Sequence, residues 1–122
     1  MLVVDDNQDY NELIAETLLS NGYETSSVYN GYEAEKICAY FKPDLVITDI
    51  IMPEQDGIGL LTALQNQILD NGLKVLAVSG GGRVAGSDYL TIAKNFGAQG
   101  TLEKPFSSAK LLTKVKSLHC DD

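Results

Sequence analysis

Short apolar runs alternate with helical hydrophobic stripes along the whole chain, and this alternation restricts the fold more than any other feature. The run Leu45 to Thr48 is continuously apolar up to its last residue, as is typical of a strand buried on both faces. Further apolar runs predict strands at residues 1–4 and 73–78, and weaker, more polar stretches predict strands at 24–28 and 100–103. Apolar residues spaced three and four apart predict five helices, over Tyr10 to Leu18, Ala34 to Phe41, Leu60 to Leu69, Leu90 to Phe96 and Leu111 to Leu118.

Alternating strands and helices indicate a mostly parallel sheet with helices on both faces, connected by right-handed crossovers. The predicted fold class is therefore α/β, a doubly wound five-stranded sheet flanked by five helices. A chain of 122 residues is long enough for one core, so we expect residues 1–122 to form a single domain. No segment after Leu118 is long enough for a separate output module, and the chain is a candidate for an excised domain.

Two helix starts carry specific signals. Asp9 and Glu12 are spaced like a capping box at the start of the first helix. Ser107 or Ser108 is the expected N-cap of the last helix.

The charge and cysteine content narrow the possible partners. The formal net charge is -8 with only nine Lys and Arg, which argues against direct binding of nucleic acid by this chain. The chain contains no apolar run of the roughly 20 residues needed to cross a membrane and no visible signal peptide, so no membrane partner is expected. Cys38 and Cys120 have no metal-ligand spacing, and we expect a reducing, cytoplasmic location.

Polar residues follow the predicted strands at one edge of the sheet. The first strand ends at Asp5 and Asp6, the third at Asp49, the fourth at Ser79 and the fifth at Lys104. Because ligands gather at the carboxyl ends of parallel strands, these side chains form a candidate site. Carboxylates within a few Å repel one another by about 4 kcal/mol per close pair at an effective dielectric of 20. A hard divalent cation such as Mg²⁺ relieves this repulsion.

Simpler roles exist for three of these residues. Asp49 is also suited to capping the following turn, and Lys104 to a strand-end salt bridge with one of the aspartates. Ser79 precedes three glycines, which is also a turn signal.

Four motifs occur in the order expected for a known family: LVVDDN at 2–7, LVITDIIMPEQDG at 45–57, Ser79 at a strand end, and EKPF at 103–106. With these motifs the chain resembles the receiver domain of two-component response regulators, over nearly its whole length. The resemblance is to chemotaxis-regulator-like proteins with a flavodoxin-like fold, and it implies the strand order 2-1-3-4-5.

The resemblance also implies the chemical roles at the site. Asp49 would be the phosphoacceptor, and Asp5, Asp6 and Asp49 would hold Mg²⁺ or Mn²⁺ together with the backbone carbonyl of Ile51. These oxygen ligands suit Mg²⁺, which prefers one or two carboxylates plus waters and readily adds a phosphate oxygen.

Four further positions complete the family pattern. The resemblance implies that Ser79 is the switch hydroxyl and that Lys104 is the cationic partner of the phosphoryl group. It also implies a cis peptide bond before Pro105. Many family members have an aromatic switch residue three positions before the lysine; here that position is Thr101, which departs from the pattern.

The function implied by the resemblance is a phosphorylation-dependent signalling switch in a two-component phosphorelay. A histidine kinase or a histidine phosphotransfer protein would donate the phosphoryl group, and the change in conformation would control an output domain or protein. Such a chain is not a conventional turnover enzyme, although it catalyses its own aspartyl phosphorylation and dephosphorylation.

Three alternatives remain at this stage. A haloacid-type phosphatase also uses a strand-end Asp and Mg²⁺, but that family needs a second Asp where this chain has Ile51. A flavodoxin-like module would bind a flavin phosphate at residues 79–82, which leaves the three aspartates unexplained. A degenerate receiver would fold alike and stay unphosphorylated.

Overall fold

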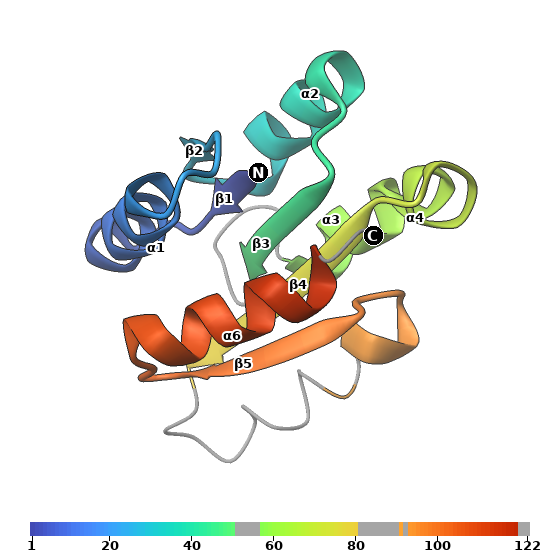
Figure 1. The fold of residues 1–122 in the computed structure, drawn as a ribbon. Helices are drawn as coiled ribbons and strands as arrows, with labels where there is room; N and C mark the ends of the chain where they lie inside the picture. Colours follow the sequence, from blue (N-terminus) through green and yellow to red (C-terminus); the bar gives the residue numbers. More distant parts are fainter. Residues whose placement is uncertain (51–56, 81–90, 92, 120–122) are drawn as a thin grey trace.

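The computed structural model describes residues 1–50, 57–80, 91 and 93–119 of the chain. In these ranges five strands form one sheet in the order β2-β1-β3-β4-β5, and every neighbouring pair is parallel (Figure 1). The predicted doubly wound α/β fold and strand order are therefore confirmed. The strands are β1 (Leu2–Val4), β2 (Ser26–Val28), β3 (Leu45–Asp49), β4 (Lys74–Gly80) and β5 (Gly100–Lys104).

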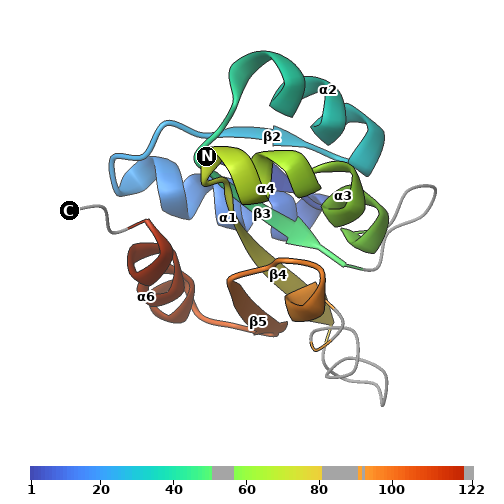
Figure 2. The same ribbon diagram turned by 90° about the vertical axis from the view of Figure 1, so that its right-hand side faces the viewer.

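Helices cover both faces of the sheet, as the views in Figures 1 and 2 show. The labelled helices are α1 (Gln8–Ser20), α2 (Gly31–Phe41), α3 (Gly57–Ala63), α4 (Gln65–Asn71) and α6 (Ser108–Leu118). Side chains of α1 and α6 pack on one face of the sheet, and side chains of α2, α3 and α4 pack on the other. None of the described helices is both long and apolar enough to span a membrane.

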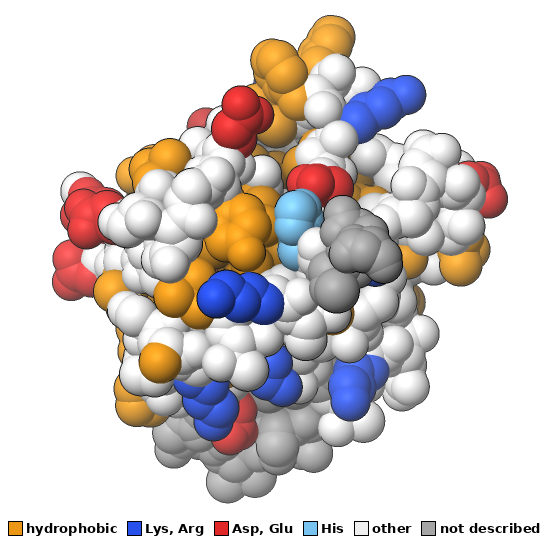
Figure 3. Space-filling view, in the orientation of Figure 1, with side chains coloured by type: hydrophobic (Ala, Val, Ile, Leu, Met, Phe, Trp, Pro, Cys, Tyr) orange, Lys and Arg blue, Asp and Glu red, His pale blue; other side chains and the backbone are white. Residues whose placement is uncertain are grey.

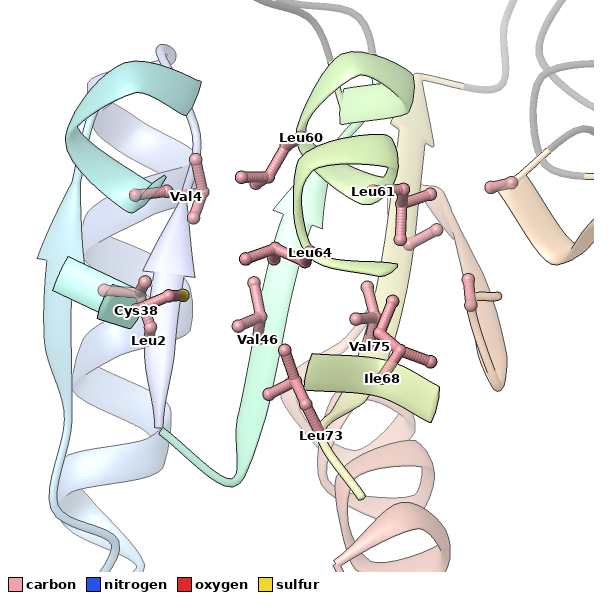
Figure 4. Close-up of a cluster of buried hydrophobic side chains, with 14 of the residues drawn as sticks. Leu2, Val4, Cys38, Val46, Leu60, Leu61, Leu64, Ile68, Leu73 and Val75 are labelled. Carbon is pink, nitrogen blue, oxygen red and sulfur yellow. The ribbon is translucent and has the colours of Figure 1, made fainter. Parts of the chain in front are cut away.

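The central strands are buried on both faces because their alternate side chains enter two separate cores. In β1, Leu2 and Val4 belong to the core under α2–α4, while Val3 belongs to the core under α1 and α6. Figure 4 shows the first of these cores, where Val46 of β3 and Val75 of β4 lie among leucines of the helices. The edge strand β2 is instead polar and mostly exposed.

The third predicted helix, Leu60 to Leu69, is divided into α3 and α4, so this segment holds one helix more than predicted. Leu64 separates them with φ -96° and ψ 6°. Its amide donates to the carbonyls of both Leu60 (3.0 Å) and Leu61 (3.2 Å), and the Gln65 side-chain amide donates to Leu61 as well (3.1 Å). The bond from the Leu64 amide to Leu61 spans only three residues and so tightens the turn, a local effect that hydrophobic spacing does not report.

The cap predicted for the first helix was wrong. Asn7, not Asp9, is the N-cap of α1, and its side-chain oxygen accepts from the Tyr10 amide at 3.0 Å. The last helix is capped as predicted by Ser107, which accepts from the Lys110 amide at 3.1 Å. Asn and Asp are about equally good caps, so the sequence pattern did not decide between Asn7 and Asp9.

Four described residues of the predicted apolar stripes are exposed: Leu13 (37%) and Phe96 (39%) moderately, and Phe41 and Leu69 strongly. Phe41 and Leu69 are both 75% exposed. Phe41 is the last residue of α2, where the chain turns through Lys42 with φ 47°. Leu69 follows the break at Leu64, and Ile68 takes the buried position of α4.

The fourth predicted helix lies only partly within the described residues, where residues 91 and 93–95 are helical. Ala93, in its second half, is fully buried. Gly97, predicted to end it, has φ +111°, which is left-handed backbone that favours glycine.

The reactivity of the Cys38 thiol reports how tightly α2 packs on the sheet. The thiol is completely buried, and burial raises its pKa to about 11. Only about one thiol in a thousand is ionised at pH 8 for such a pKa, and the thiolate is the reactive form. We expect Cys38 in a Cys120→Ser variant to react with a thiol reagent at pH 8 only after denaturation in urea. Fast reaction of the native variant, monitored by absorbance, would contradict this packing.

Candidate functional site

The carboxyl edge of the sheet brings three of the predicted site residues into direct contact. Asp5 follows β1, Asp49 ends β3 and Lys104 ends β5, and these strands are parallel. The Lys104 ammonium donates to Asp5 Oδ2 at 2.9 Å and to Asp49 Oδ2 at 3.1 Å. One cation therefore connects strands β1 and β5, which have two other strands between them.

Asp6 completes a cluster of three carboxylates with Asp5 and Asp49. One oxygen from each residue lies within 4.8 Å of the others. Asp5 and Asp49 are buried, whereas Asp6 is exposed and opens the cluster to solvent. Lys104 neutralises only one of the three negative charges, and all the candidate ligand atoms are hard oxygens. The cluster therefore fits a divalent cation of the Mg²⁺ type.

Burial and charge shift two pKa values at the site. Burial, followed by the charge of Asp49, raises the pKa of Asp5, although the Asn7 amide and Lys104 act in the opposite direction. Burial alone would lower the pKa of Lys104, but its bonds to Asp5 and its attraction to Asp49 outweigh burial and raise it. Lys104 therefore stays protonated at neutral pH, and Asp5 binds a proton more readily than an exposed aspartate.

Two asparagines that the sequence analysis missed hold the Asp5 loop in place. The Asn7 amide donates to Asp5 Oδ1 at 2.9 Å. The buried Asn11 side chain donates to the carbonyls of Asp5 (3.0 Å) and Val28 (2.8 Å), at the ends of β1 and β2. A sequence signal existed, because Asn11 stands at a buried position of the stripe that contains Ile14 and Leu18.

An aromatic contact to Lys104 was also missed. The Lys104 ammonium lies 4.2 Å from the centroid of the Tyr10 ring, and the Tyr10 ring lies 5.6 Å from that of Phe106. Tyr10 was expected only as the first residue of an apolar stripe.

The other residues predicted for the site are Ser79, Thr101, Pro105 and Ile51. Ser79, in β4, is completely buried, and its hydroxyl has no hydrogen-bond partner among the described residues. Thr101 is half-buried and pairs with Ala77 across β4 and β5. The Lys104–Pro105 peptide bond is cis. Ile51, predicted to offer its carbonyl to a metal, lies outside the described residues.

The amino edge of the sheet carries different features. A cavity of about 490 Å³ is lined there by residues that include Met1, Ser26 and Asp44, and it contains none of the site residues. Figure 3 shows the only histidine of the chain, in pale blue, at the surface. This residue, His119, contacts Asp44 at 2.8 Å and so joins the end of α6 to the start of β3.

Comparison with known proteins agrees with this geometry. The sequence model of the response regulator receiver domain family matches residues 1–116. The transcriptional regulatory protein PrrA of Mycobacterium leprae is 35% identical over 118 residues, which are 97% of this chain and 48% of that protein. The chain thus spans about half the length of the curated relatives it matches.

Solved structures show the same relationship. The receiver domain of NtrX from Brucella abortus is similar with a TM-score of 0.88 and 29% identity, covering 99% of this chain and 98% of that one. The chemotaxis response regulator CheY4 of Vibrio cholerae has a TM-score of 0.85 and 26% identity, covering 96% and 95%. The chain belongs to the receiver domain family of two-component response regulators.

Asn11 is predicted to stabilise the site loop. Asn11→Ala removes the side-chain donor to the Asp5 carbonyl and leaves the Val28 carbonyl with only the Asp5 amide, so we expect a loss of about 1–3 kcal/mol in the free energy of unfolding. Urea denaturation measures it. Gln8→Ala, which removes only an exposed bond to Glu12, is the control and should change stability by less than about 0.5 kcal/mol. Equal effects of the two substitutions would refute the role of Asn11.

Lys104→Met is predicted to destabilise the metal-free protein in a pH-dependent way. It leaves two buried carboxylates without their cation, for a loss of about 3 kcal/mol at pH 7. The pKa of Asp5 rises further without Lys104, so the folded variant binds this proton more tightly than the unfolded chain. Stability then falls as pH rises above the ordinary carboxyl value, and the deficit should be smaller at pH 5 than at pH 7.

Urea denaturation at both pH values, with a chelator present, checks this prediction. Lys110→Met is the matched control, because Lys110 is exposed in the first turn of α6. A deficit that is the same at pH 5 and pH 7 would show that repulsion between the carboxylates is not the cause.

Proposed function

We propose that this chain is a phosphorylation-dependent switch in which Asp49 accepts a phosphoryl group. The observation that carries the proposal is the Lys104 ammonium, which bonds to both Asp5 and Asp49 within a cluster of three carboxylates. A carboxylate beside a fixed cation, at the solvent-facing edge of a rigid sheet, has the features of a nucleophile for phosphoryl transfer.

Asp49 and Lys104 have separate roles in the transfer. A carboxylate oxygen of Asp49 attacks phosphorus, the bond from phosphorus to the donor breaks, and the donor group leaves. Lys104 remains beside Asp49 and neutralises negative charge on the phosphoryl oxygens. The same groups would serve hydrolysis of the aspartyl phosphate by water, so the chain promotes its own phosphorylation and dephosphorylation without turning over a separate substrate.

Asp5, Asp6 and Asp49 would hold Mg²⁺ or Mn²⁺, with the Ile51 carbonyl as a further ligand. When bound, the ion supplies positive charge to the carboxylates and to the incoming phosphoryl group. Asp6 is exposed, and this supports an entry path for the ion.

Ser79 is the proposed sensor of phosphorylation. Its buried hydroxyl has no hydrogen-bond partner among the described residues, and a buried hydroxyl without a partner is energetically unfavourable. A phosphoryl oxygen on Asp49 would accept this bond and draw the end of β4 inward. Thr101, on the neighbouring strand β5, would take the place of the usual aromatic switch residue.

The partners follow from the family. The phosphoryl donor would be a histidine kinase or a histidine phosphotransfer protein. The output would be a further domain or a separate protein, and the name of PrrA, a transcriptional regulatory protein about twice as long as this chain, supports an output in transcription. Direct contact with nucleic acid is not assigned to this chain, whose net charge is -8. A cytoplasmic location fits these partners.

Acetyl phosphate and Mg²⁺ test the function directly. We expect the intact mass of the protein to increase by one phosphoryl group, only with the metal present, and Asp49→Asn to abolish the increase. Asp44→Asn is the matched control, because it changes an aspartate at the opposite edge of the sheet and should be phosphorylated like the wild type.

Beryllofluoride, which mimics a bound phosphoryl group, provides a second readout through NMR shifts that need Mg²⁺ and Asp49. Equal phosphorylation of Asp49→Asn would place the acceptor elsewhere. A wild-type protein that responds to neither reagent would be a degenerate receiver.

A further inference from the structure

Tyr10 is the one aromatic residue in the described part of the chain that contacts the ammonium of Lys104. It lies in the first turn of α1, is half-buried, and places its ring centroid 4.2 Å from Lys104 Nζ. A cation within about 6 Å of a ring centroid is attracted to the face of the ring. None of the roles assigned above uses this residue.

The ring is itself held firmly against the cation. The Tyr10 ring packs on Phe106 at 5.6 Å and 46°, and Phe106 packs against the core beneath α1 and α6. The Tyr10 amide donates to Asn7 Oδ1, and the Asn7 amide donates to Asp5 Oδ1. The first turn of α1 therefore fixes the positions of the ring and of the Asp5 carboxylate together.

Phosphorylation would change the contact of Lys104 with Asp49 and leave its contact with the Tyr10 ring chemically unchanged. In the unphosphorylated protein its ammonium bonds to one oxygen each of Asp5 and Asp49. Once Asp49 is phosphorylated, its carboxylate becomes an acyl phosphate and the negative charge lies on the phosphoryl oxygens, so the ammonium would turn toward those oxygens while staying beside Asp49. A lysine side chain is flexible, whereas the Tyr10 ring is unchanged by the reaction and limits where the ammonium goes.

We propose that Tyr10 is a positioning residue. Its ring holds the Lys104 ammonium, through a cation–π contact, within reach of the phosphoryl group on Asp49. This inference rests on the proposed function. It assigns the effect to the π face of the ring and not to the hydroxyl or to the apolar bulk of the side chain.

Three variants separate these contributions. Tyr10→Phe keeps the ring and removes the hydroxyl, and Tyr10→Leu keeps apolar bulk and removes the ring. Tyr32→Leu, at an exposed aromatic position on α2, is the matched control. The rate of phosphorylation by acetyl phosphate at saturating Mg²⁺ is compared with the midpoint of urea denaturation for each variant.

We expect Tyr10→Phe and Tyr32→Leu to react within about twofold of the wild type, and Tyr10→Leu to react about fivefold more slowly, as a partly buried cation–π contact implies. The slow variant should still be fully folded under the assay conditions. NMR should show that the Lys104 side-chain signals lose their ring-current shift in Tyr10→Leu and keep it in Tyr10→Phe.

Several results would overturn the inference. These are a wild-type rate for Tyr10→Leu, an equal loss in Tyr10→Phe, which would point to the hydroxyl, and a loss explained by unfolding. A wild-type protein that accepts no phosphoryl group refutes the proposed function itself, and the inference with it. That outcome is distinguishable, because the Tyr10 variants are compared with a wild type that reacts.

Discussion

The ammonium of Lys104 lies between two buried carboxylates, and the arrangement of the carboxyl edge of the sheet depends on this interaction. Asp5 and Asp49 come from strands β1 and β3, and Lys104 comes from β5 at the edge of the sheet. One cation does not balance the three carboxylates of the cluster once Asp6 is counted. Lys104 therefore reduces the repulsion between the carboxylates, and the negative charge that remains favours binding of a metal ion.

The two-sided core gives this edge its rigidity. Because β1 and β3 contribute alternate side chains to two cores, neither strand shifts without disturbing both. The polar residues at the strand ends are in turn held by local bonds, from the Asn7 amide to the Asp5 carboxylate and from the Asn11 side chain to two strand-end carbonyls. The polar groups of the carboxyl edge are therefore held in place both by the core and by these bonds.

Hydrophobic spacing predicted the strands, their parallel arrangement and most buried positions, because burial in this fold follows directly from residue type. It did not predict the break at Leu64 or the exposure of Phe41, since both depend on where a helix ends relative to the sheet. The choice of Asn7 over Asp9 as the cap of α1 has a different cause, because Asn and Asp cap helices about equally well.

The sequence by itself determined which chemical groups stand at the strand ends: Asp5, Asp6, Asp49, Ser79 and Lys104. The structure brings the three aspartates and Lys104 together. Parallel strands bring their carboxyl ends to one edge whatever the details of packing. Only the tertiary structure decided the contacts of Lys104 with two carboxylates and with the ring of Tyr10. Those contacts join residues about 50 to 100 positions apart, and their distances follow from how α1 and β5 pack onto the sheet, which no local sequence pattern encodes.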